Sequence, residues 1–190
     1  MTNLDISFNE NTISTFKNFI GKTFNLFKCD EFCYTPSVYG LIGLYIDGKP
    51  FKLTNFHEYI DRFGNKDDVA VFRFQKAIDS EIVSQLDNQK FIDIPINDTI
   101  EKINIINETQ KLYKEDVLSH ELTCTRGIIF FMKDGLEISF EKEVWFSEFI
   151  TYRKGYGLYD KFESTNDFIE EWKDSIYNKA ECSRNIIELS

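Results

Sequence analysis

The residues best suited to hold a metal ion are a cysteine pair and a histidine–cysteine pair. Cys29 and Cys33 are separated by three residues, and so are His120 and Cys124. Thiolate and imidazole are the usual ligands of a tetrahedral zinc ion. However, structural zinc sites mostly place two residues between paired cysteines, and these two pairs lie far apart in the chain. We expect no bound metal, with zinc as the alternative, because free cysteines are commonly small buried apolar side chains.

The same thiols would act as nucleophiles only beside a histidine that accepts their proton. Such a pair would join Cys33 or Cys124 to His57 or His120, in direct contact and with a lowered thiol pKa. No glycine elbow or comparable motif surrounds any of the cysteines. Neighbouring carboxylates are numerous, but they arise without purpose in so acidic a chain. We therefore expect no catalytic residues, no cofactor and no enzymatic activity, with an enzyme whose cleft assembles from distant residues as an alternative.

The segment from Thr165 to Tyr177 has the pattern of an amphipathic helix. Its apolar face would consist of Phe168, Ile169, Trp172 and Ile176. Its opposite face would carry only acidic residues, which are Asp167, Glu170, Glu171 and Asp174. Like charges one turn apart destabilise a helix by about 0.2–0.5 kcal/mol per pair. An acidic stripe without compensating Lys or Arg predicts contact with a cationic partner, and the alternative is a solvated face that improves solubility.

Aromatic residues precede this helix in the chain. Because only alternate side chains of a strand point inward, some of the rings between positions 145 and 159 would face outward. Those that we assign to a partner-binding surface are Trp145, Phe149, Tyr152, Tyr156 and Tyr159. Aromatic anchors surrounded by carboxylates are typical of an interface for a basic protein. The alternative is that both faces of the strand are covered and the rings belong to the core.

The overall charge agrees with a basic partner. The chain has 190 residues, with 22 Lys and Arg against 32 Asp and Glu, so its formal net charge is −10. This sign excludes nonspecific binding to nucleic acid. No signal peptide or membrane-spanning apolar run is present in the sequence, so we expect a cytoplasmic protein whose four cysteines are free thiols. The many Ile, Asn, Lys and Phe residues are typical of AT-rich coding and point to a bacterial or phage source.

The alternation of apolar and polar residues predicts an α+β fold for residues 1–190. We expect a mainly antiparallel sheet built from two Asp-Gly hairpins, at 47–48 and 134–135, with a few packed helices. The expected helices cover about 13–20, 56–63, 80–86 and 165–177, and the expected strands include 100–106, 122–132, 136–140 and 144–153. Pro95 demotes the run from 91 to 96 to an edge strand or a connection. Aligning Gly40 with Gly127 superposes the two Asp-Gly turns without a gap, so residues 1–90 and 91–190 are candidate pseudo-repeat halves.

Taken together, these patterns predict a cytoplasmic binding protein that neutralises a basic macromolecule by occluding its surface. An inhibitor or immunity-type protein against a toxin or a nucleic-acid enzyme fits this description, because such enzymes carry basic grooves for a polyanionic substrate. We expect no direct contact with nucleic acid or membrane. The alternative from another class is a regulatory or adaptor domain stabilised by zinc at Cys29, Cys33, His120 and Cys124.

Overall fold

A computed structural model describes residues 2–32, 36–87, 89–143 and 145–190. The chain folds mainly as antiparallel sheet with two helices, consistent with the expected α+β class. The strands are β1 (Thr2–Ile6), β2 (Thr23–Cys29), β3 (Ser37–Tyr39), β4 (Leu41–Ile46), β5 (Lys49–Arg62), β6 (Asn65–Lys76), β7 (Ile92–Lys114), β8 (Val117–Met132), β9 (Glu137–Lys142), β10 (Phe149–Gly155) and β11 (Lys179–Leu189). The helices are α1 (Glu10–Lys17) and α2 (Asn166–Trp172), and short 3-10 turns lie at Asp79–Glu81 and Leu158–Lys161. The pseudo-repeat of two halves stays a prediction.

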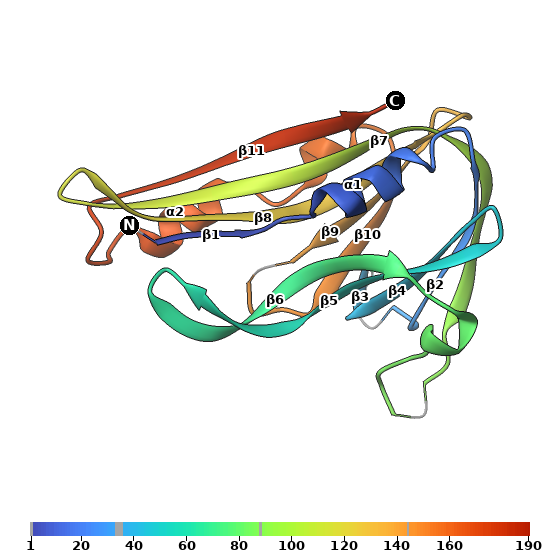
Figure 1. Cartoon of the computed structure of the whole chain (residues 1–190), viewed down its shortest axis with the longest axis horizontal. Helices are drawn as coiled ribbons and strands as arrows, with labels where there is room; N and C mark the ends of the chain where they lie inside the picture. The colour runs from blue at the N-terminus through green and yellow to red at the C-terminus, as the bar shows by residue number, and fades with distance from the viewer. Residues whose placement is uncertain (1, 33–35, 88, 144) are drawn as a thin grey trace.

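The strands form two curved layers that share the long strand β7 (Figure 1). Residues 92–99 of β7 pair with β2, which leads on to β4, β5 and β6. Residues 100–114 of β7 pair with β8, which leads on to β9, β10 and β3, while β11 pairs with the other edge of β7. All pairs are antiparallel except that of β1 with β8. One strand therefore fixes the position of both layers.

A second connection between the layers runs through Gly40. This residue separates β3, which pairs with β10, from β4, which pairs with β2 and β5. Its φ of +58° lies in the left-handed region, and a Cβ at this position would lie 2.2 Å from Cε1 of Phe56. Glycine is therefore required here for both its backbone conformation and its lack of a side chain.

Helix α1 closes the space between the layers. Asn9 caps it by accepting a hydrogen bond from the Thr12 amide, and Glu10 in the first turn complements the helix dipole. Phe16 of α1 is fully buried in the main core, 4.3 Å from the ring centre of Phe74. The helix is thus held by a buried aromatic contact as well as by its cap.

The helix expected over residues 56–63 is wrong, because this segment continues β5. Its register with β6 is unbroken up to the pair Arg62–Asn65, and a turn through Phe63 and Gly64 at positive φ joins the two strands. The apolar residues of this segment are spaced three and four apart, as on one face of a helix. However, they do not share one buried face, because Tyr59 is exposed while Phe63 is buried. Cross-strand pairing along the whole segment outweighs that local spacing. The expected helix near 80–86 is only the 3-10 turn at 79–81.

The C-terminal part also differs from expectation. Helix α2 ends at Trp172, five residues before the predicted end, and its N-cap is Thr165 with no side-chain capping bond. Residues 179–189 form β11, which the sequence reading did not predict. The strand expected to begin at 144 begins at Phe149. The run from 91 to 96, which carries Pro95, pairs from Ile92 with β2 on one side only, as an edge strand does.

The outer face of the β7–β8–β9 layer is covered by residues 158–172, here called the covering segment. Leu158 and Phe162 of this segment pack on Ile106 and Ile129 of the sheet. Phe162 lies directly over Gly127, where an added Cβ would meet its ring at 2.6 Å and the carbonyl oxygen of Phe140 at 2.8 Å. Close packing of the covering segment therefore depends on the missing side chain at Gly127.

We predict that Gly127→Ala loosens the covering segment. The new methyl group would displace Phe162, and overpacking of this kind costs roughly 1–3 kcal/mol of unfolding free energy. The expected result is a lower denaturant midpoint together with faster limited proteolysis within 158–172. Gly155→Ala is the matched control, because a Cβ there would make only an ordinary contact of 3.6 Å with Leu158. Equal midpoints and equal cleavage for the two variants would contradict the prediction.

Candidate functional site

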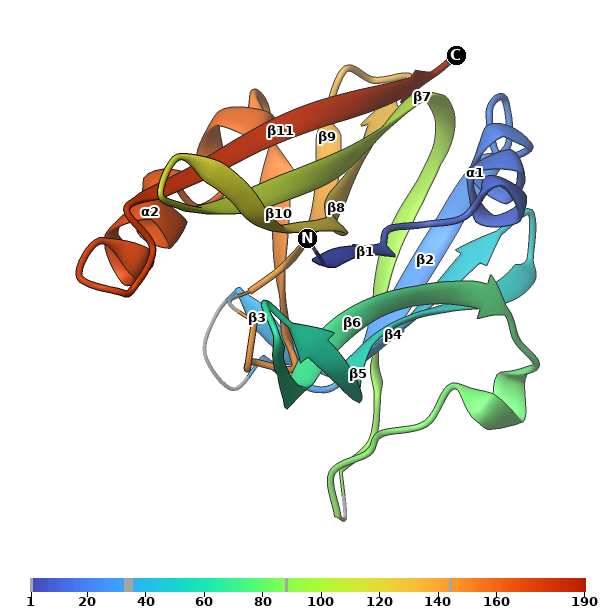
Figure 2. The same ribbon diagram turned by 60° about the vertical axis from the view of Figure 1, so that its left-hand side comes forward.

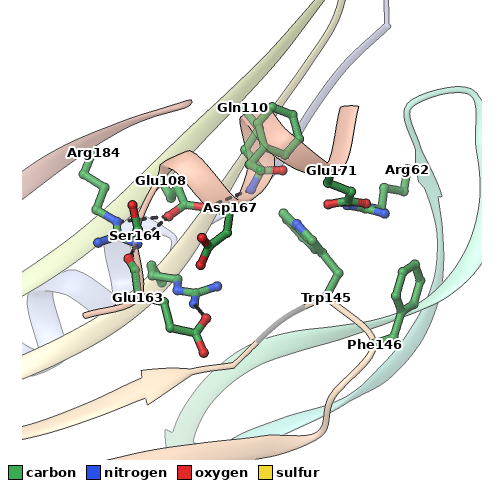
Figure 3. A pocket seen from close by; sticks show the side chains of 12 residues that line it. Arg62, Glu108, Gln110, Trp145, Phe146, Glu163, Ser164, Asp167, Glu171 and Arg184 are labelled. Atoms are coloured by element: carbon green, nitrogen blue, oxygen red, sulfur yellow. Dashed lines mark hydrogen bonds and ion pairs between the residues drawn. The ribbon is translucent and has the colours of Figure 1, made fainter. Parts of the chain in front are cut away.

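A pocket of about 260 Å³ lies between the sheet and the covering segment (Figure 3). The sheet contributes Glu108 and Gln110 from β7, Arg126 from β8 and Arg184 from β11. The other walls are Arg62, Trp145, Phe146, Glu163, Ser164, Asp167, Phe168 and Glu171. Small-molecule sites usually occupy roughly 300–1,000 Å³, so this volume suits a single side chain or a fragment.

Two buried arginines hold the floor of the pocket to the covering segment. Arg184 pairs with Glu108 at 2.9 Å and donates a 2.6 Å hydrogen bond to the backbone carbonyl of Glu163. Arg126 pairs with the buried Glu141 at 3.4 Å and with the side chain of Glu163. Burial opposes the charge of Arg126, but Glu108, Glu141 and Glu163 outweigh it and raise the pKa of the guanidinium. Both arginines are therefore paired with carboxylates that the protein itself supplies.

A third arginine occupies an aromatic environment at the other end of the pocket. Arg62 is buried, and its Nη2 atom donates to both carboxylate oxygens of Glu171, at 3.0 and 3.2 Å. Its guanidinium carbon lies 5.2 Å from the ring centre of Trp145 and 5.1 Å from that of Phe146. These are cation–π distances, and they show that this part of the pocket accommodates a guanidinium between rings and a carboxylate.

Two acceptors of the pocket have no partner among the described residues. The carboxylate of Asp167 makes no hydrogen bond or ion pair there, although the residue lines the pocket. The Gln110 side chain is 2% exposed; its amide nitrogen donates to Glu108 at 2.8 Å, while its oxygen is buried without a donor. Since the carboxylate of Glu108 can only accept, this hydrogen bond settles which atom of the Gln110 amide is the oxygen. Four carboxylates face three guanidiniums, so the pocket lining carries a surplus negative charge at Asp167.

A buried lysine lies next to this group of charges. Lys142 is 1% exposed, and its ammonium group has no hydrogen-bond partner among the described residues. The nitrogen lies 5.0 Å from the ring centre of Trp145, which is a wall of the pocket. Burial lowers the pKa of Lys142 to about 8, with the charge of Arg126 acting in the same direction.

The predicted partner-binding residues do not form one surface. The pocket brings together Trp145, Asp167 and Glu171. Phe149 and Tyr152 are partly buried, and Tyr152 packs 4.7 Å from Phe27 in the core. The exposed Tyr156 borders a different hollow, beside Lys154 and Lys161, and Tyr159 borders a third.

Two carboxylates of the predicted acidic stripe, Glu170 and Glu171, are paired with cations in the structure. Glu170 and Asp174 are exposed, as predicted. However, Glu170 pairs with Lys173 at 3.2 Å and Glu171 pairs with Arg62, so the stripe is not free of compensating cations. The apolar face is shorter than expected because the helix ends at Trp172, which leaves Ile176 77% exposed.

The alternative zinc set is not assembled by the described residues. His120 and Cys124 lie four residues apart on the extended strand β8, a distance of about 13 Å, whereas two ligands of one zinc ion lie within a few ångströms of each other. Cys29 is buried on β2, and Cys33 lies outside the described residues. Over 2–32, 36–87, 89–143 and 145–190, no cluster of three His, Cys, Asp or Glu side chains is arranged to hold a metal ion.

The same separation argues against a nucleophilic pair between Cys124 and His120. The other histidine, His57, lies with one ring nitrogen 3.1 Å from the carbonyl oxygen of Phe146 and the other 3.5 Å from Glu148. Burial raises the pKa of Cys29 and of Cys124 to about 12, and it also raises that of Cys182. These thiols are therefore protonated at neutral pH and are poor nucleophiles.

Sequence analysis did not identify most of the pocket. The residues it missed include Arg62, Glu108, Gln110, Arg126, Phe146, Glu163, Ser164 and Arg184. One signal was available: Glu108 and Gln110 alternate within a strand whose preceding residues are mostly Ile, and such inward polar residues need partners. Arg184 carried no signal, because its strand was not predicted.

Comparison with known proteins does not assign the chain to a group, since no protein-family model, curated protein or solved structure matches it. Across the described part of the chain, neither helix has the length and continuous apolar character needed to cross a lipid bilayer. The pocket and the surface must therefore be interpreted from their own chemistry.

We predict that Lys142→Met stabilises the protein at pH 7 by roughly 1–3 kcal/mol, because it removes an unpaired buried charge. The unfolded lysine has a pKa of 10.5, against about 8 in the folded protein. Between these values the unfolded chain binds more protons, so the wild-type penalty declines as the pH rises through this range. The measurement is the difference in unfolding free energy between variant and wild type at pH 7 and pH 10.

The expected difference at pH 10 is small. Lys154→Met, at an exposed position without an ion pair among the described residues, is the control and should change little at either pH. A Lys142→Met variant less stable than wild type at pH 7 would show that the ammonium group is stabilising there.

We also predict that the three described cysteines are unreactive in the folded protein. In a Cys33→Ser variant, a disulfide reagent such as DTNB at pH 8 should modify Cys29, Cys124 and Cys182 only after denaturation, because their thiolate forms are scarce. The measurement is the amplitude of rapid colour release with and without denaturant. A full equivalent of fast-reacting thiol in the native variant would refute this.

Proposed function

We propose that this protein binds a basic macromolecular partner and blocks that partner's working surface, as an inhibitor or immunity-type protein does. The observation that supports the proposal is the pocket, where the unpaired carboxylate of Asp167 lies among aromatic walls and two further half-exposed carboxylates, Glu163 and Glu171. A net charge of −10 would accelerate encounter with a cationic surface.

The interface that we propose is smaller than the sequence pattern indicates. It is centred on the pocket, with the half-exposed Phe146 at its rim and the exposed Glu170 and Asp174 on the adjoining surface of the covering segment and the turn after it. Trp145 contributes as a buried wall rather than as a protruding anchor. Tyr152 and Phe149 support the fold and lie outside the proposed interface.

The test is a pair of charge-matched triple variants. One, Asp167→Asn with Glu170→Gln and Asp174→Asn, removes three charges from the proposed interface. The other, Glu10→Gln with Asp87→Asn and Glu101→Gln, removes three exposed charges elsewhere, and Figure 2 shows α1, where Glu10 lies, on the opposite side of the molecule from α2. Both variants have the same net charge, so any difference between them reports position.

The partner is first captured from source-cell extract at low salt on immobilised wild-type protein, identified and purified. The association rate constant and inhibition of the partner's activity are then measured across ionic strength. We expect the wild-type rate to fall as salt rises, and the interface variant to associate about tenfold more slowly at low salt while the control keeps most of the rate. A rate independent of salt, or equal losses for both variants, would contradict the proposal.

A further inference from the structure

We propose that the pocket receives the guanidinium group of an arginine side chain presented by the basic partner. This inference rests on the proposed function and specifies its central contact. It places the incoming group between the carboxylate of Asp167 and the indole of Trp145, in the space shown in Figure 3.

The two unsatisfied acceptors of the pocket favour a donor, although Nε of Arg62 is also buried without a partner among the described residues. Asp167 offers an unpaired carboxylate, and Gln110 offers a buried carbonyl oxygen that accepts no hydrogen bond from the described residues. A buried acceptor without a donor is costly, so a ligand that supplies N–H groups would relieve that cost on binding. The Gln110 oxygen is an uncharged acceptor, and it points to the same ligand chemistry as the carboxylate of Asp167.

The aromatic walls favour a planar cation over a compact one. A guanidinium can stack on a ring while its N–H groups donate in the plane, whereas an ammonium group has no flat face. The protein already shows this arrangement once, since Arg62 lies against Trp145 and Phe146 while it donates to both oxygens of Glu171. The proposed ligand would repeat this with Asp167 in place of Glu171.

The nearby arginines do not forbid a further cation. Arg62 is paired with Glu171, Arg184 with Glu108, and Arg126 with both Glu141 and Glu163. Lys142 lowers the favourable potential from beneath, but burial moves its pKa to about 8, so it loses its charge more readily than an ordinary lysine. The surplus charge that remains in the lining is that of Asp167.

The test uses the purified full chain and small blocked amino acids. Nα-acetyl-arginine amide is titrated while the two indole N–H signals are followed by NMR; the protein has only two tryptophans, and Trp172→Phe assigns them. We expect a saturable shift of the Trp145 signal, with a dissociation constant on the order of millimolar for so small a ligand. The neutral isostere Nα-acetyl-citrulline amide should bind about tenfold more weakly, because it lacks the charge-assisted hydrogen bonds.

The variants separate the site from a general effect of charge. Asp167→Asn should weaken binding of the arginine probe at least about fivefold, because the unpaired carboxylate is its main charged contact. Glu101→Gln removes an exposed carboxylate on β7 away from the pocket and should leave binding unchanged. Equal binding of the arginine and citrulline probes, or equal losses in the two variants, would overturn the inference.

The outcomes also distinguish this inference from the proposed function. If the arginine probe leaves the Trp145 signal unmoved but a basic partner still associates in a salt-dependent way that needs Asp167, Glu170 and Asp174, the function stands and the arginine contact is wrong. If the probe binds with the expected dependence on Asp167 but the interface and control variants inhibit the partner equally, the site stands and the proposed function is wrong.

Discussion

The arrangement of the candidate site depends on buried guanidinium groups that bond to half-exposed carboxylates and a backbone carbonyl of the covering segment. Arg126 and Arg184 project from β8 and β11, and both bond to Glu163, one to its side chain and one to its backbone. Arg62 makes the corresponding contact to Glu171 at the other end. Removing one of these carboxylates would leave a buried guanidinium without its counterion, which is destabilising. These pairs therefore determine where α2 lies, and with it the width of the pocket.

This constraint also explains the charge of the pocket. Arginines buried beneath a segment would normally attract an anion, but here the protein supplies the anions itself. Glu163 and Glu171 are neutralised by Arg126 and Arg62, and each lies four residues from Asp167 along the chain. Asp167, the middle carboxylate of the three, has no arginine opposite it among the described residues. The recognition chemistry that we propose rests on this incomplete match, because it leaves the carboxylate of Asp167 without a cation among the described residues.

The sequence allowed the class of fold to be predicted, but only part of its elements. The strands at 122–132 and 136–140 were readable because apolar, β-branched and aromatic residues flank the Asp-Gly pair at 134–135. In the structure most of these residues are buried on both faces of the sheet. The segment 56–63 was misread because a long hairpin strand satisfies its hydrogen bonds across the sheet, whatever spacing its apolar residues have. Strand β11 has few fully buried side chains, since one of its faces is largely exposed, and its alternation was correspondingly weak.

The candidate site was less predictable than the fold. Its aromatic and acidic members on 145–171 are close in sequence and could be suspected together. Its arginines come from the end of β5, from β8 and from β11, and only the pairing of β7 with both β8 and β11 brings two of them to one face. Charge alternation within a single strand does not identify which distant strand will supply the counterion.

The sharing of β7 by both layers has a consequence for the order in which the molecule can assemble. The first half of β7 pairs with β2, which precedes it in the chain. The free edge of its second half pairs with β11, which begins more than sixty residues after β7 ends. Until then the isoleucine-rich edge at 103–106 presents open backbone groups to other chains, which is a hazard for aggregation. Because Arg184 lies on β11, the strand that covers this edge also completes the pocket.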